Sequence, residues 1–217
     1  TVAVELWDEG AELSYEGFAP SVSLARPLPF TIPRGAAPLA ARPVVCGLGP
    51  AGLFAALVLA QAGFAPLVLE RGPAMEKRAA AVKAFEQTGV LQPEANIQFG
   101  EGGAGTFSDG KLTTRIHDPL CAFVKQTLLS HGAPPEVAWQ QKPHVGTDKL
   151  RGVIQSIRRE IERLGGEVRF ETKLTGLCTA RGRLAAVRTS AGDVPCGALV
   201  LAPGHSARDT FFMLADA

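Results

Sequence analysis

Residues 44–52 read Val-Val-Cys-Gly-Leu-Gly-Pro-Ala-Gly, and this stretch constrains the fold more than any other part of the chain. A short apolar strand here runs into the glycine pattern GxGxxG. In a dinucleotide site Gly47 allows the tight turn, Gly49 lets the backbone approach a pyrophosphate, and Gly52 lets the next helix lie close to the sheet. The N-terminus of that helix offers free N–H groups and a positive dipole end to phosphates.

A second apolar run and a carboxylate follow at the spacing that such a site needs. Residues 53–60 form a helix of small and apolar residues, and Gly63 is well placed to end it. Residues 67–69 are Leu-Val-Leu, and Glu70 comes directly after them. An acid at this point of a βαβ unit binds ribose hydroxyls. The segment therefore predicts a βαβ unit that holds a dinucleotide.

The composition agrees with a globular domain and excludes several function classes. The 217 residues are 46% hydrophobic and carry a net charge of +1, which indicates neither nucleic acid nor an acidic membrane surface as a partner. The longest apolar stretch is far shorter than a membrane span, and no signal-peptide pattern opens the chain. We therefore expect a cytoplasmic protein. The cysteines lack a CxxC pair, which argues against a redox disulfide and a zinc cluster: Cys46, Cys121, Cys178 and Cys196.

The first 42 residues differ from the rest. Six prolines lie between residues 20 and 43, a density that forbids a helix and predicts an extended linker. Both a surface-hugging tail and the remnant of an N-terminal module fit this pattern. We expect a boundary near residue 43, with the dinucleotide-binding domain over residues 43–217.

Two further segments carry candidate ligand contacts. Residues 75–88 read as a helix with a basic face, on which Arg78 is a candidate phosphate or ribose contact and otherwise a solvated charge. Residues 99–112, FGEGGAGTFSDGKL, are too rich in glycine for a helix or strand interior. Such a loop can pass close to a flat or anionic ligand, or it can be a flexible surface loop. Its apolar residues favour the first interpretation, because they would tether the loop to a core.

Residues 113–146 are the least informative part of the chain and form a possible start of an inserted substrate-side segment. A helix is expected from about residue 117 to Ser130. The histidines at positions 117, 131 and 144 share no metal-ligand spacing, so no metal site is predicted.

The last third predicts regular structure throughout. Thr147 is expected to cap an amphipathic helix that ends at residues 165–166. Three short strands within residues 174–195, joined by tight turns, predict an antiparallel meander. Residues 198–202 form a fully apolar strand suited to the buried middle of a parallel sheet. This strand leads into a second glycine turn at Gly204, where ligands gather in open α/β sheets.

In this order, the motifs resemble the flavoproteins with two dinucleotide-binding domains, whose N-terminal site holds FAD. In that superfamily the strand matching residues 199–204 normally ends Ala-Thr-Gly, and Pro203 replaces the threonine here. The sequence FGEGGAGTFSDGKL narrows the resemblance to a bacterial family of FAD-dependent dehydrogenases of generally unassigned substrate. The resemblance implies an α/β, Rossmann-like FAD-binding fold with a central parallel sheet and an antiparallel β-meander. It also implies C-terminal truncation, since such proteins continue with another strand and helix.

The resemblance assigns roles to individual positions. The FAD pyrophosphate would lie on the glycine turn, the adenosine on the residues after the second strand and at the start of the meander, and the ribityl chain or flavin ring beside the glycine-rich loop. Lys111 could also stabilise a reduced, anionic flavin. The full set of predicted cofactor contacts is Gly47, Gly49, Pro50, Ala51, Gly52, Glu70, Arg71, Arg78, Gly102, Gly103, Ala104, Gly105, Thr106, Ser108, Asp109, Gly110, Lys111, Leu174, Gly204 and His205.

The function expected from these features is an FAD-dependent oxidoreductase that moves a hydride between an organic substrate and the flavin, with NAD(P)H as a possible electron donor. No acid or base can be assigned from the sequence. Two alternatives stay open at this point. One is an NAD(P)-dependent dehydrogenase, and the other is a flavin-dependent RNA-modifying enzyme or a non-redox FAD-binding protein. The neutral charge disfavours RNA.

Overall fold

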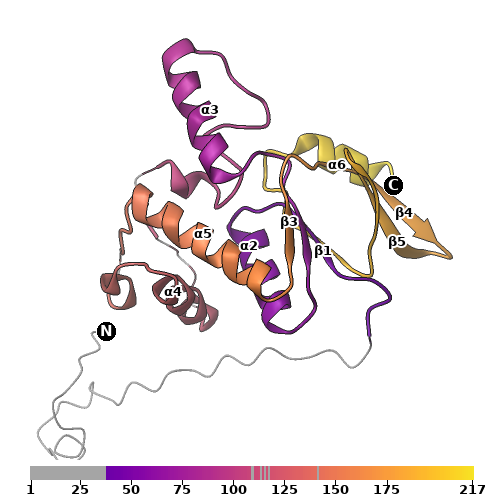
Figure 1. The fold of residues 1–217 in the computed structure, drawn as a ribbon, viewed down its shortest axis with the longest axis horizontal. Coiled ribbons are helices and arrows are strands. Elements are labelled where there is room, and N and C mark those ends of the chain that lie inside the picture. Colours follow the sequence, from indigo (N-terminus) through magenta and orange to yellow (C-terminus); the bar gives the residue numbers. More distant parts are fainter. Residues whose placement is uncertain (1–37, 109, 113, 115, 117, 141) are drawn as a thin grey trace, which may run out of the picture.

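The computed structural model describes residues 38–217, except residues 109, 113, 115, 117 and 141 (Figure 1). The prediction of an extended linker falls mostly on residues outside this part of the chain, and Asp109 also lies outside it. The described residues form a mixed α/β structure built on two sheets.

The first sheet is parallel and has the strand order β3-β2-β1-β7. Its strands are β1 (Val44–Cys46), β2 (Leu67–Leu69), β3 (Glu167–Arg169) and β7 (Leu199–Leu201). Strand β1 pairs with β2 on one side and with β7 on the other, so the predicted βαβ unit lies at the centre of the arrangement. Every side chain of β1 and β2 is buried, as is typical of a parallel sheet covered on both faces.

The two faces of this sheet contribute to different cores, because successive side chains of a strand point to opposite sides. Val45 and Val68 pack against the helices α2 (Pro50–Gln61) and α5 (Thr147–Arg163). Val44 and Leu67 face the second sheet, the antiparallel β4-β5-β6. The result is three layers: helices, parallel sheet and meander (Figure 1).

The antiparallel meander predicted within residues 174–195 is present. It comprises β4 (Leu174–Ala180), β5 (Arg183–Thr189) and β6 (Gly192–Pro195). Arg181 and Gly182, with φ of 52° and 72°, make the tight turn between β4 and β5. Two positive φ angles in succession match the twist of the flanking strands, which is why glycine follows arginine here.

The predicted helices are also present. They are α3 (Met75–Thr88), which projects from the sheet layer in Figure 1, α4 (Leu120–Ser130) and α5; a further helix, α6 (Arg208–Ala215), follows β7. Short 3-10 turns lie at Ala104–Thr106 and Pro135–Ala138. The predicted cap of α5 is wrong: Gly146 holds the N-cap position without a side-chain bond, and Thr147 is the first helical residue.

The position predicted for β7 is also wrong. This strand lies at an edge of the described sheet, and Leu201 is 41% exposed. A fully apolar run predicts burial but not the number of neighbouring strands, and β7 has only β1 beside it within the described residues.

The strand order, the crossover through α2 and the meander identify a Rossmann-like fold. None of the described helices is long and apolar enough to cross a bilayer. Nor do the described side chains bring three metal-ligating groups close enough together to hold an ion.

Candidate functional site

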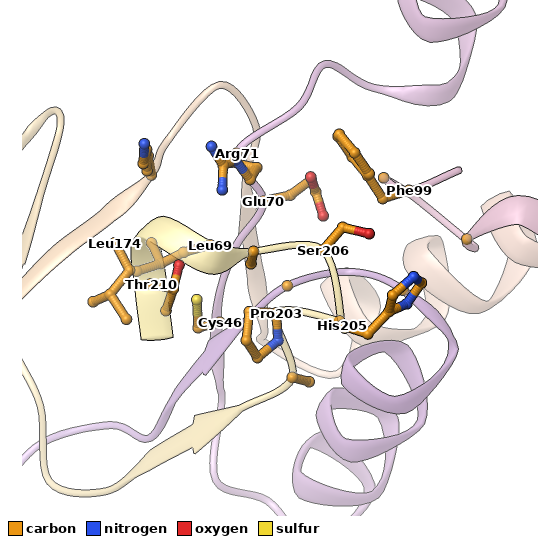
Figure 2. Close-up of a pocket in the computed structure, with 18 of the residues that line it drawn as sticks. Cys46, Leu69, Glu70, Arg71, Phe99, Leu174, Pro203, His205, Ser206 and Thr210 are labelled. Carbon is orange, nitrogen blue, oxygen red and sulfur yellow. The ribbon is translucent and has the colours of Figure 1, made fainter. Parts of the chain in front are cut away.

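A cavity of about 500 Å³ opens at the carboxyl ends of β1, β2 and β7. This is the edge at which open α/β sheets bind ligands, and the volume falls within the range of small-molecule sites. Figure 2 shows labelled residues from several segments arranged around it. The lining comprises Cys46, Gly47, Gly49, Pro50, Leu69, Glu70, Arg71, Pro93, Gln98, Phe99, Gly100, Gly103, Ala104, Thr172, Lys173, Leu174, Ala202, Pro203, Gly204, His205, Ser206, Ala207, Arg208, Asp209 and Thr210.

The turn after β1 is packed so tightly that only glycine fits at two of its positions. Gly47 has a φ of +98°, and a Cβ there would collide with the carbonyl of Ala202. A Cβ on Gly52 would collide with the Gly47 carbonyl, so this glycine brings the start of α2 against the turn. Gly49 differs, because a Cβ on it would meet no atom within 4 Å. The space beside Gly49 is therefore open, and it belongs to the cavity lining.

Glu70 holds this turn in place through hydrogen bonds to two backbone N–H groups. One carboxylate oxygen accepts the N–H of Leu48 at 2.8 Å, and the other accepts the N–H of Gly72 at 2.8 Å. The side chain is 3% exposed. Burial raises the pKa of the carboxyl, while the two backbone donors and the nearby arginines act in the opposite direction. Each oxygen has a second lone pair, so Glu70 can still accept a hydroxyl from the cavity.

Charged side chains from four segments meet at one end of the cavity, and we call them the rim cluster: Arg71, Glu94, Lys173 and Asp209. Arg71 donates to the Glu94 carboxylate at 2.8 Å and to Asp209 at 3.0 and 3.1 Å. Lys173 also pairs with Asp209. These cations lower the pKa of Asp209 well below its usual range, and the two carboxylates raise the pKa of Arg71. The cluster ties the start of α6 to the end of β2.

Arg78, predicted as a phosphate or ribose contact, lies beneath the cavity and not in its lining. Its guanidinium is completely buried, and its five N–H groups all find acceptors. The acceptors all lie in residues 96–107, which we call the glycine loop. They are the carbonyls of Asn96, Ile97, Glu101 and Gly103 and the hydroxyl of Thr106, at 2.8–3.2 Å. No N–H of this side chain is left to contact a ligand.

A second buried charge fastens the glycine loop to two helices. Glu101 is completely buried and accepts the N–H of Met75, at the start of α3, at 2.7 Å. It also accepts from Nε of Arg158 on α5 at 2.8 Å. Burial raises the pKa of Glu101, and Arg158 opposes that shift.

An aromatic ring completes the fastening. The guanidiniums of Arg78 and Arg151 lie 4.5 and 4.2 Å from the centroid of the Phe107 ring. Arg151 also donates to the carbonyl of Thr106 at 2.8 Å. Among the described residues, then, the glycine loop is a fixed wall of the cavity and not a free surface loop.

The structure brings about half of the predicted contacts to the cavity: Gly47, Gly49, Pro50, Glu70, Arg71, Gly103, Ala104, Leu174, Gly204 and His205. The other described members of the predicted set lie outside its lining: Ala51, Gly52, Arg78, Gly102, Gly105, Thr106, Ser108, Gly110 and Lys111. Lys111 forms a β-bridge with His144, beyond the end of the glycine loop. Its role in flavin tuning stays a prediction.

Sequence reasoning missed the acids that organise the site. Glu94 and Asp209 carry no recognisable pattern, and Glu101 lies within the glycine-rich motif but was not among its predicted contacts; the partners of all three are distant in the chain. The Cys46 thiol also lines the cavity, where burial raises its pKa to about 11, so it stays protonated at neutral pH. Only the helical start signal around Asp209 could have pointed to one of these residues.

Comparison with known proteins gives one close sequence relative. No protein-family profile matches the chain. An uncharacterized protein of Clostridium beijerinckii is 53% identical over 184 residues, which cover 85% of this chain. The same residues cover only 34% of that protein, so the chain spans about a third of its relative's length.

Two solved structures are similar to this chain, and one of them supports the fold. THI4 of Thermovibrio ammonificans is similar with a TM-score of 0.51 at 13% identity, over 81% of this chain and 62% of that one. The L-proline dehydrogenase of P. horikoshii is similar with a TM-score of 0.45 at 14% identity, over 82% of this chain and 57% of that one. At such identities the likeness to THI4 supports the Rossmann-like architecture alone.

Proposed function

We propose that this chain is the cofactor-binding part of an FAD-dependent oxidoreductase. The observation that carries the proposal is the cavity at the carboxyl ends of β1, β2 and β7, which has the N-terminus of α2 and the carboxylate of Glu70 on its wall. A helix N-terminus attracts a pyrophosphate, and an acid after the second strand accepts ribose hydroxyls. The solved structures similar to this chain include an L-proline dehydrogenase, which agrees with redox chemistry.

The residues present fit a dinucleotide. The open space beside Gly49 faces the helix N-terminus, where a pyrophosphate would lie without side-chain obstruction. Glu70 would hold the adenosine ribose, and Leu174 at the start of the meander would contact the adenine. The glycine loop would flank the rest of the molecule with Gly103 and Ala104.

When bound, FAD would supply hydride acceptance and donation at its ring, while the protein binds and orients it and excludes water. The tightly packed glycine turn and the buried Glu70 would hold the phosphate and ribose ends of the ligand. The Cys46 thiol stays protonated because its pKa is raised by burial. It therefore contributes an apolar surface to the cavity lining and does not act as a nucleophile. The substrate, the use of NAD(P)H as donor and the hydride-transfer step are part of the proposal.

Titration of the purified chain with FAD, FMN and NAD⁺ tests the proposed function, with visible flavin absorbance and calorimetry as readouts. We expect FAD to bind more tightly than the other two. Tight NAD⁺ binding without FAD binding would favour the NAD(P)-dependent dehydrogenase instead. Binding of FMN equal to that of FAD would show that the adenosine half is not held.

A variant at the open position locates the binding. Gly49→Leu fills the space beside the α2 N-terminus without meeting protein atoms within 4 Å at its Cβ. FAD affinity should fall at least about tenfold, a change of only about 1.4 kcal/mol. Gly152→Leu is the matched control, because a Cβ there also meets nothing within 4 Å and Gly152 lies on α5 away from the cavity lining. Equal FAD affinity in the Gly49→Leu protein would place the pyrophosphate elsewhere.

A further inference from the structure

The glycine loop folds around Arg78 with its carbonyls turned inward. The guanidinium binds the carbonyl oxygens of Ile97, Glu101 and Gly103, among others. Thr106 adds to this by donating its hydroxyl to the Gly103 carbonyl at 2.8 Å. The orientation of the loop peptides is therefore set from below, by one side chain.

Because carbonyl groups of the glycine loop point toward Arg78, the N–H groups of the same peptides point away from it. In a trans peptide the C=O and the N–H point in opposite directions. The peptide between Gly103 and Ala104 has its carbonyl on Arg78, so the N–H of Ala104 points away from the buried side. Ala104 is exposed and lines the cavity. Arg78 thus directs a backbone donor toward the space in which a ligand would lie.

This donor lies next to the N-terminus of α2. Gly102 donates its N–H to the carbonyl of Leu48, in the turn after β1, at 2.8 Å. A Cβ on Gly103 would lie 2.8 Å from Cδ of Pro50, the first residue of α2. The glycine loop and the helix N-terminus are therefore in direct contact, and their outward N–H groups border the same part of the cavity.

We propose that Arg78 is a positioning residue for the phosphate groups of the ligand: it holds the glycine loop so that the Ala104 N–H joins the α2 N-terminus in binding them. The inference rests on the proposed function, that the cavity takes a dinucleotide. Arginine is required because its planar guanidinium presents five N–H groups in fixed directions, whereas lysine has three on a single nitrogen. Arg78→Lys keeps the charge but cannot satisfy five acceptors.

The test compares ligands with and without phosphates. FAD, ADP and adenosine are titrated by calorimetry into the full chain carrying Arg78→Lys. We expect affinity for FAD and ADP to fall about tenfold, the effect of a charge-assisted hydrogen-bond contribution, while adenosine affinity changes less than about twofold. Lys83→Met, which removes an exposed cation from the same helix, is the control and should bind all three ligands as the wild type does.

Each other outcome is decisive. Unchanged ADP affinity in Arg78→Lys overturns the inference, and so does an equal loss for adenosine, because a merely structural role would weaken every ligand. If circular dichroism shows that Arg78→Lys does not fold, Thr106→Val removes one acceptor of Arg78 and should give a smaller loss for ADP with adenosine spared. If the wild type binds neither FAD nor ADP, the proposed function itself fails and the inference falls with it.

Discussion

Two arginines seven positions apart, Arg71 and Arg78, show how differently one residue type can be used at the same cavity. Arg71 belongs to the rim cluster, keeps a quarter of its side chain exposed and pairs with carboxylates that are themselves more than 40% exposed. Arg78 is completely buried and pairs with carbonyls and a hydroxyl. Exposed ion pairs contribute little because water competes for both partners, whereas a buried group without its partner is very costly. Substitutions in the rim cluster should therefore cost little stability, whereas substitution of Arg78 should cost much.

The largest expected effect is on stability and separates the two arginines. Arg78→Met removes all five of its hydrogen bonds, three of which are buried, and should lower the free energy of unfolding by about 3–5 kcal/mol. Arg71→Met should lower it by about 1 kcal/mol or less. Urea unfolding followed by circular dichroism measures both. Equal losses would mean that the rim cluster stabilises the fold as strongly as the buried guanidinium does.

A buried carboxylate of the glycine loop should contribute more to stability than an exposed carboxylate of the rim cluster, as with the two arginines. Glu101 is completely buried and accepts from Met75 and Arg158, while the side chain of Glu94 is 45% exposed. Glu101→Gln puts an amide NH₂ against one of two donors and should cost about 2–3 kcal/mol. Glu94→Gln should cost about 0.5 kcal/mol. The pair is compared by urea unfolding, and a smaller loss for Glu101→Gln than for Glu94→Gln would contradict the distinction.

A pair of glycines isolates the contact with Arg78 from backbone strain. Gly100 and Gly192 have φ of +109° and +110°, so alanine is strained at both positions. Only at Gly100 would the new Cβ meet the Arg78 side chain, at 3.1 Å from Cδ and Nε. Gly100→Ala should therefore be about 1–2 kcal/mol more destabilising than Gly192→Ala, where the new Cβ meets nothing within 4 Å. Equal melting temperatures would show that the loop can move away from Arg78 at no cost.

The sequence predicted the backbone of the site better than its side-chain partners. The glycine turn, Glu70 and the second turn at Gly204 follow from local spacing, because each role needs one residue type at one point of a βαβ unit. The contacts of Arg71 with Asp209 join residues 138 positions apart. The sequence predicts a solvated charge or a ligand contact at Arg78, since the helical pattern cannot show that a loop 18 to 28 residues later closes over it. The burial of that arginine is a tertiary property.

The smallest expected effect concerns pH and the rim cluster alone. Arg71 and Lys173 lower the folded-state pKa of Asp209, so the stability it contributes is present above its unfolded pKa of about 4 and is lost as pH falls toward the lowered value. Because its side chain is 42% exposed, this contribution should be about 0.5 kcal/mol. Between pH 6 and pH 3 the wild type should therefore lose slightly more stability than Asp209→Asn, measured by urea unfolding at each pH. The bonds of Arg78 have no such dependence in this range, since its pKa, lowered by burial, is still about 10. An identical pH dependence in wild type and Asp209→Asn would mean that water already replaces the rim contacts, and α6 would then be held over the cavity by packing alone.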